Sequence, residues 1–325
     1  MRYLVTGGAG FIGSHLADAL RNRGNTLALF DDLSTGNLGN IDHLLGKDGV
    51  TFNQGSIRDR DLVDGLVSEA DVVVHLAASV GVQLVVQRPL EAFLNNVRGT
   101  EIVLEACAKH DRKVLVTSTS EIYGKNTKSN LKEEDDRILG SPFKTRWAYS
   151  TSKAVDEILA HTYWREKGTP SIVVRLFNTV GPRQTGAYGM VIPRLVQQAL
   201  RAEDLTVYGD GTQTRCFCHV HDVVEGLIRL LEHPEAVGEV FNVGSLQEIS
   251  ITDLAKSVIE MADSPSRVVY IPYDEAYEEG FEDMQRRHPD ISKINALTGW
   301  RPTRTLEQII DDVIVFEKER LATPS

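Results

Sequence analysis

Short apolar runs alternate with amphipathic stretches along the first half of the chain. The runs are rich in β-branched residues, are bounded by turn formers, and predict strands at residues 3–6, 27–31, 51–54, 72–76, 113–118 and 172–177. Between them, apolar residues recur every three or four positions, which predicts helices such as 14–23, 90–110 and 149–167. This alternation predicts an α/β fold, with a Rossmann-type doubly wound parallel sheet and helices on both faces.

The regular alternation ends after about residue 180. Turn signals then follow at Gly181-Pro182, Gly209-Asp210-Gly211 and Ser264-Pro265. We therefore expect a Rossmann domain over 1–180 and a smaller C-terminal α/β substrate lobe, mainly over 181–325. A segment of about 214–243 is expected to return to the first domain. Because no linker-like tract separates the two parts, they should pack together around a cleft.

Composition narrows the classes of partner. The chain has 325 residues, of which 42% are hydrophobic and 25% charged, as in ordinary globular proteins. Its net charge of -11 argues against nucleic acid as a partner, because an acidic surface repels polyphosphate. No signal peptide or membrane-spanning run is apparent, so we expect a cytoplasmic protein with no membrane partner. Cys216 and Cys218 do not have the spacing of zinc ligands, and we expect no metal.

A glycine-rich turn between the first predicted strand and helix is the first chemical signal. Gly7 permits a tight turn, Gly10 lets the backbone approach a pyrophosphate, and Gly13 lets helix and strand pack closely. The N-terminus of the helix favours the negative charge of that pyrophosphate. Asp31 closes the next strand. It follows Gly7 by 31 − 7 = 24 residues, close to the ~20 expected of a ribose-binding carboxylate. Because Asp31 and Asp32 would repel a 2′-phosphate, the pattern predicts NAD rather than NADP.

The second signal is a tyrosine and a lysine four residues apart in a predicted helix. Tyr149 and Lys153 share one helical face, so the ammonium is expected to stabilise a phenolate and lower the pKa of the tyrosine. Such a pair is common by chance. Here, however, the strand 113–118 runs into Thr119-Ser120-Glu121, and the carboxyl ends of parallel strands are where ligands gather.

These motifs resemble those of the extended short-chain dehydrogenase/reductase family. The resemblance spans nearly the whole chain and also includes His75-Leu76-Ala77-Ala78, Asn96-Val97-Arg98-Gly99-Thr100 and Arg175-Leu176-Phe177-Asn178. Within the family the chain is similar to NAD-dependent nucleotide-sugar epimerases, dehydratases and decarboxylases.

The resemblance implies roles for individual residues. The catalytic residues would be Thr119, Ser120, Glu121, Tyr149 and Lys153. Tyr149 would be the base, Lys153 its helper, and Thr119 the hydroxyl that forms a hydrogen bond with the sugar O4. The expected NAD-binding residues are Gly7, Gly10, Phe11, Ile12, Gly13, Asp31, Asp32, Ser34, Gly36, Ser56, Ile57, Leu76, Ala77, Ala78, Asn96, Thr117, Tyr149 and Lys153. The expected substrate-binding residues are Asn178, Val191, Arg194, Val207, Tyr208, Gln213, Arg215 and Arg287. Ser56 departs from the aspartate usual in the family, which leaves the adenine contact open.

The same resemblance implies chemistry at C4 of a nucleotide sugar. Oxidation at C4 gives a 4-keto sugar, and the main expectation is a 4-epimerase of UDP-hexoses or UDP-hexuronates that restores its NAD internally. Glu121 favours C5 chemistry instead, so a UDP-glucuronate decarboxylase or a 4,6-dehydratase is the alternative. A non-catalytic NAD-sensing module is the alternative from another class. The two long helices 90–110 and 149–167 imply a homodimer, since the family pairs its subunits there.

Overall fold

The computed structural model describes residues 1–79, 89–144, 146–186, 190–276 and 284–322. Seven parallel strands form the central sheet, in the order β11-β6-β5-β4-β1-β2-β3. Their bounds are β1 (Arg2–Thr6), β2 (Thr26–Asp31), β3 (Val50–Gln54), β4 (Val72–His75), β5 (Lys113–Thr119), β6 (Ser171–Leu176) and β11 (Val240–Val243). All six strands predicted from the sequence are present, and the predicted Rossmann-type sheet is confirmed.

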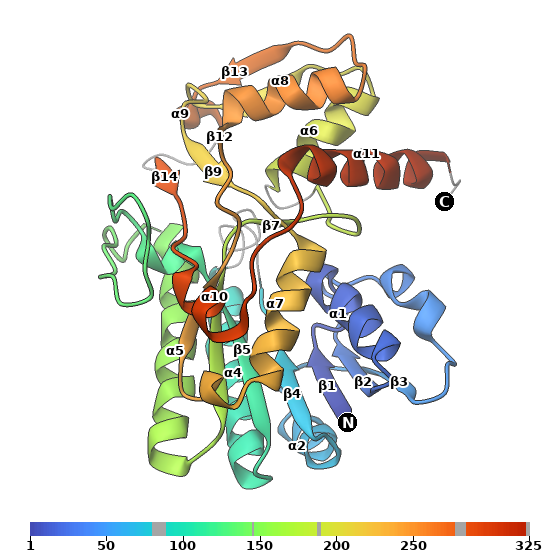
Figure 1. Ribbon diagram of the computed structural model, residues 1–325, viewed down its shortest axis with the longest axis vertical. Helices are drawn as coiled ribbons and strands as arrows, with labels where there is room; N and C mark the ends of the chain where they lie inside the picture. Colours follow the sequence, from blue (N-terminus) through green and yellow to red (C-terminus); the bar gives the residue numbers. More distant parts are fainter. Residues whose placement is uncertain (80–88, 145, 187–189, 277–283, 323–325) are drawn as a thin grey trace.

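Helices cover both faces of this sheet (Figure 1). One face packs against α1 (Phe11–Asn22) and α7 (Val220–Glu232), and the other against α2 (Arg60–Glu69), α4 (Pro89–Lys109) and α5 (Arg146–Lys167). Successive strand residues point to opposite faces, so Val5 joins the first core and Leu4 the second. The apolar runs are continuous because the sheet is buried on both sides. α4 and α5 lie side by side, while the homodimer expected there stays a prediction.

The C-terminal part forms a smaller group of helices and short strands beside the end of the central sheet (Figure 1), and it has a hydrophobic core of its own. Its main helices are α6 (Val191–Leu200), α8 (Ile251–Met261) and α11 (Leu306–Ala322), and β8 (Leu205–Tyr208) pairs with β13 (Val268–Ile271). A three-stranded sheet has the order β12 (Glu248–Ser250), β9 (Thr214–Cys216), β14 (Arg286–Arg287). The short elements are β7 (Thr179–Val180), β10 (Cys218–His219), α9 (Tyr273–Ala276), α10 (Ser292–Thr298), η1 (Leu38–Asn40), η2 (Asp42–Leu44), η3 (Ser120–Tyr123) and η5 (Pro234–Ala236).

The chain passes between the central sheet and the C-terminal part more than once. β11 and α7 come from the second half of the sequence, yet β11 pairs with β6 and α7 packs against α1. We therefore propose that residues 214–243 belong partly to the Rossmann domain. Among the described helices, none combines the length and the apolar composition that crossing a lipid bilayer requires.

One buried carboxylate joins α7 to the segment that leads into α11. Asp222, in the first turn of α7, accepts hydrogen bonds from the Thr303 amide, the Thr303 hydroxyl and the Arg304 amide. It also accepts from the Arg304 guanidinium at 3.0 Å. The approach of the C-terminal helix to the sheet therefore depends on this side chain.

We expect Asp222→Ala to lower the free energy of unfolding by about 2 kcal/mol, because it removes the buried carboxylate that accepts hydrogen bonds from Thr303 and Arg304. Urea unfolding followed by circular dichroism measures this. Asp253→Ala, at an exposed i,i+3 pair with Lys256, is the control and should cost much less, because exposed ion pairs contribute little and Ser250 still caps α8 through the backbone amide of residue 253. Equal losses in the two variants would contradict this role of Asp222.

Candidate functional site

A large cavity opens where the parallel strands end. Its walls come from the ends of β1, β2, β4, β5 and β6 on one side and from α6, β8, β9 and β14 on the other. Its volume of about 490 Å³ is within the ~300–1,000 Å³ typical of ligand sites. The carboxyl edge of an open α/β sheet is the general place for such a site.

The glycine turn forms one end of the cavity. Gly7 has φ of +69°, and a Cβ on Gly13 would lie 2.1 Å from the Gly7 carbonyl oxygen. Only glycine fits there without moving the backbone. Gly10 is the N-cap of α1 and, within the described residues, no side chain caps this helix. The first amides of α1 are therefore available to an anion such as a pyrophosphate.

Asp31 fixes the far side of this turn. It is buried at the end of β2 and accepts hydrogen bonds from the amides of Ala9, at 3.0 Å, and Leu33, at 2.8 Å. Burial raises the pKa of Asp31, and those two amides oppose the rise. A Cβ on Gly36 would lie 2.6 Å from the Asp31 carboxylate, so Gly36 leaves room for that carboxylate. The turn, the uncapped helix and the carboxylate fit an NAD molecule.

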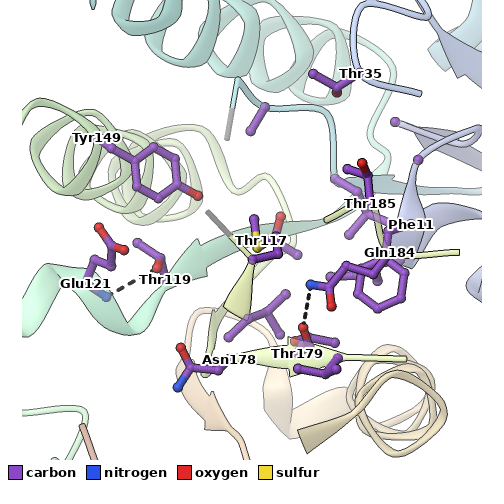
Figure 2. Close-up of a pocket in the computed structure, with 18 of the residues that line it drawn as sticks. Phe11, Thr35, Thr117, Thr119, Glu121, Tyr149, Asn178, Thr179, Gln184 and Thr185 are labelled. Carbon is purple, nitrogen blue, oxygen red and sulfur yellow. Dashed lines mark hydrogen bonds between the residues drawn. The ribbon is translucent and has the colours of Figure 1, made fainter. Parts of the chain in front are cut away.

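The opposite end gathers the predicted catalytic side chains (Figure 2). Thr119 ends β5 and caps η3 by accepting a hydrogen bond from the Glu121 amide at 3.2 Å. The Ser150 hydroxyl donates to the Glu121 carbonyl at 2.8 Å, which ties the start of α5 to η3. Figure 2 shows Tyr149, Thr119 and Glu121 close together, with the Tyr149 hydroxyl pointing into the cavity.

The electrostatics of Tyr149 differ from the expectation. Burial raises the pKa of Tyr149 well above its ordinary value, and the carboxylates of Glu121 and Asp156 add to the rise. Lys153 is buried, and its ammonium donates a hydrogen bond to Asp156 Oδ2 at 2.8 Å. The predicted lowering of the Tyr149 pKa by Lys153 is therefore wrong for the protein alone, first because burial disfavours the charged phenolate, and then because the carboxylates of Glu121 and Asp156 disfavour it as well.

Two arginines far apart in the sequence meet at the cavity wall. β14 pairs with β9 in parallel, with Arg287 in register with Arg215, and both residues line the cavity. Neighbouring guanidinium groups suit a diphosphate. Arg287 Nη1 also lies 3.5 Å from Glu121 Oε1, and both side chains are mostly buried. The arginine pair and the Tyr149 end are therefore parts of one site.

The remaining wall is aromatic and polar. The Arg194 guanidinium carbon lies 4.5 Å from the centre of the Tyr208 ring, and its Nη1 donates to the Thr206 carbonyl at 2.8 Å. Gln213 donates to the Tyr208 carbonyl at 3.0 Å. Asn178, after β6, donates to the Cys216 carbonyl at 3.0 Å, which links the sheet to the lobe.

Most of the site residues predicted from the sequence line this cavity. Four do not: Val207 is buried in the core of the lobe, and Asn96 is buried with its amide on Ser79 and Ser152. Gly36 and Ser56 also lie outside the lining, although Gly36 is in contact with Asp31. The lining residues predicted from the sequence are Gly7, Gly10, Phe11, Ile12, Gly13, Asp31, Asp32, Ser34, Ile57, Leu76, Ala77, Ala78, Thr117, Thr119, Ser120, Glu121, Tyr149, Lys153, Asn178, Val191, Arg194, Tyr208, Gln213, Arg215 and Arg287.

Several wall residues were missed from the sequence. Gln184 and Thr185 follow β7 and lie near Phe11, at the start of α1 (Figure 2). The side-chain amide of Gln184 donates a hydrogen bond to the Thr179 carbonyl at 2.9 Å. Phe217 and Tyr273 complete the side formed by the lobe. The only sequence signal for Gln184 and Thr185 is the turn at Gly181-Pro182, which marks a loop without showing its direction.

Known proteins share both this sequence and this architecture. The model of the NAD dependent epimerase/dehydratase family matches residues 3–244. The chain belongs to this family. The resemblance noted from its motifs is thereby confirmed, and so is NAD as its cofactor.

Individual relatives carry out different reactions. The chain is 39% identical to a UDP-N-acetyl-alpha-D-glucosaminuronate decarboxylase of Bacillus cytotoxicus, in an alignment that covers 98% of each protein. The solved UDP-glucuronic acid 4-epimerase of Bacillus cereus, in complex with UDP-glucuronic acid and NAD, is 30% identical with a TM-score of 0.89, covering 98% of this chain and 100% of that one. A dTDP-glucose 4,6-dehydratase of Bacillus anthracis with NAD is 28% identical with a TM-score of 0.86, covering 98% and 97%.

The glycine turn yields a test of cofactor binding. Gly13→Ala should weaken NAD binding by roughly a hundredfold or more, because the added methyl group forces the Gly7 carbonyl out of the turn. Isothermal titration calorimetry with NAD measures the change. Gly65→Ala is the matched control, since a Cβ at Gly65, inside α2, meets nothing within 4 Å. Unchanged affinity in Gly13→Ala would contradict the placement of NAD at this turn.

Proposed function

We propose that this enzyme decarboxylates a nucleotide-linked hexuronate, of the UDP-glucuronate class, through a transient 4-keto sugar. The observation that carries the proposal is the Glu121–Arg287 ion pair beside Tyr149 and Thr119. A simple hexose epimerase needs no carboxylate at this position, whereas chemistry at C5 needs an acid–base group there. The decarboxylase relative, at 39% identity over the whole chain, supports the same choice.

The proposed sequence begins at C4. Tyr149, as a phenolate, removes the proton of the C4 hydroxyl, while Thr119 holds O4 by a hydrogen bond. NAD held at the glycine turn and Asp31 would supply the acceptor for the C4 hydride and, once reduced, the donor that restores it. Tyr149 keeps the O4 proton until then. Because the cofactor is restored, the reaction consumes no external NADH.

Carbon dioxide leaves from the ketone stage. A hexuronate oxidised at C4 is a β-keto acid, so the C5–C6 bond breaks and its electron pair forms an enolate over C5 and C4. Glu121 is the group available to deliver a solvent proton to C5, and Arg287 orients it. Tyr149 then returns its proton to O4. The products are a nucleotide pentose and carbon dioxide, with one proton taken from solvent.

Arg215 and Arg287 would hold the diphosphate of the substrate. Their side-by-side placement on β9 and β14 gives two permanent positive charges within an acidic protein. The Tyr208 wall, stacked by Arg194, offers a flat surface for the nucleotide base.

Epimerisation of a hexuronate at C4 is the second candidate. It was the main expectation from the sequence, and the Bacillus cereus epimerase, at 30% identity over the whole chain, favours it. The comparisons favour decarboxylation more, through the higher identity of the decarboxylase. The two reactions share Tyr149, Thr119 and the 4-keto sugar, and differ in whether the carboxylate is lost.

The product separates the candidates directly. Purified protein mixed with UDP-glucuronate or UDP-N-acetylglucosaminuronate should give a UDP-pentose and an equal amount of carbon dioxide. Proton NMR identifies the sugar product. A hexuronate inverted at C4, with no carbon dioxide, would replace this proposal by the epimerase. Turnover that survives Tyr149→Phe would favour a different chemistry, and an absence of turnover with any UDP-sugar would favour the NAD-sensing alternative.

The role of Glu121 has its own test. Glu121→Gln should reduce carbon dioxide release by about a hundredfold or more, the usual contribution of a general acid–base group, with NAD binding retained. Glu248→Gln is the matched control, because Glu248 pairs with Arg286, the neighbour of Arg287, and does not line the cavity. A similar loss in both variants would show that Glu121 is structural.

A further inference from the structure

Lys153 has a charged partner that is not part of the cavity wall. Its ammonium donates to Asp156 Oδ2 at 2.8 Å, and the two side chains are 3% and 0% exposed. Asp156 is one turn further along α5 and is absent from the lining of the cavity. Its second oxygen, Oδ1, is buried and has no partner at hydrogen-bond distance among the residues that the structure describes. The Thr100 hydroxyl is the other group, beside Lys153, that opposes the rise in the Asp156 pKa caused by burial. Lys153 is therefore the main group that stabilises this carboxylate.

The groups around this pair are neutral or already paired. His75, on β4, is held between the hydroxyls of Thr6 and Thr100 at 2.8 and 3.1 Å. Burial, with a smaller effect of the Lys153 ammonium, lowers the pKa of His75 to about 3, so the imidazole carries no charge. Glu157, next to Asp156 on α5, has both oxygens on the Arg175 guanidinium, at 3.0 and 2.9 Å.

Two carboxylates then remain whose negative charge raises the pKa of Tyr149. They are Glu121, on η3 at the cavity, and Asp156, behind Lys153. Glu121 has Arg287 beside it at 3.5 Å. Asp156 thus raises the pKa of Tyr149 directly as a negative charge, and it also holds the ammonium of Lys153.

We propose that Asp156 is a positioning residue that anchors the ammonium of Lys153 and limits how strongly it stabilises a phenolate at Tyr149. The inference rests on the proposed roles of Tyr149 as base and Lys153 as its helper. In this arrangement burial and the two carboxylates disfavour the phenolate of Tyr149 in the protein alone. The positive charge of an oxidised nicotinamide ring would favour it.

The sign of the pH effect follows from the charges. The Asp156 carboxylate raises the pKa of Tyr149, so removing its charge lowers that pKa. Activity that requires the phenolate is lost as the pH falls through the Tyr149 pKa. Asp156→Asn should therefore move the acid limb of the kcat/KM profile to lower pH, by about one unit. Asparagine still offers an oxygen to Lys153, so kcat at the optimum should change only a few fold.

Asp156→Ala separates anchoring from charge. It removes the acceptor as well, leaves the ammonium without an anchor, and should lower kcat at the optimum by about tenfold or more, with KM little changed. Glu157→Gln is the matched control, because it neutralises an adjacent, mostly buried carboxylate that is bound to Arg175. This control should leave the acid limb where it is, and thermal unfolding of all variants reports any general loss of stability.

A second measurement needs no turnover. With tyrosine labelled by ¹³C at the ζ carbon and the protein saturated with NAD, the Tyr149 resonance, assigned through Tyr149→Phe, reports ionisation of the phenol. Its midpoint should be lower in Asp156→Asn than in the unaltered protein by about one unit. Because no substrate is present, this result stands even if UDP-glucuronate is not decarboxylated. An equal or higher midpoint, no ionisation in either protein, or an equal shift in Glu157→Gln would overturn the inference.

Discussion

Parallel pairing of the strands is the constraint on which the site depends. Since the strands of the central sheet all run the same way, the turn after β1, the carboxylate after β2 and the threonine that ends β5 reach the same edge. Residues separated by more than a hundred positions thereby face one cavity. The right-handed crossovers place α1 and α5 so that an uncapped helix start and the Tyr149 phenol border that cavity from two sides.

The lobe completes the site by a second, much weaker pairing. β9 and β14 have three and two residues, yet their register sets Arg215 beside Arg287 and brings Arg287 to Glu121. The first pairing places the glycine turn and Asp31, where we propose that NAD binds. We propose that the second bears on the sugar, so differences in chemistry at C5 between relatives are expected to arise here.

Local signals made the Rossmann half predictable from the sequence. Gly7, Gly13 and Asp31 have meaning at fixed distances from a strand end, and the strands themselves are continuous apolar runs. The arginine pair could be suggested only by resemblance, because strands of two or three residues have no periodicity. The state of Tyr149 was predicted wrongly, because its pKa depends first on burial and then on the carboxylates of Glu121 and Asp156, and the sequence prediction weighed only the Lys153 ammonium. Burial of a side chain at a cavity cannot be read from the spacing of Tyr149 and Lys153.

The central claim is that one carbon of a sugar is oxidised and reduced again at this edge without release of the cofactor. UDP-glucuronate carrying deuterium at C4 tests it most directly, by mass spectrometry and proton NMR of the product. The account requires that the deuterium stays at C4 of the pentose. Exchange of that deuterium for solvent hydrogen, or its appearance in free NADH, would contradict the account.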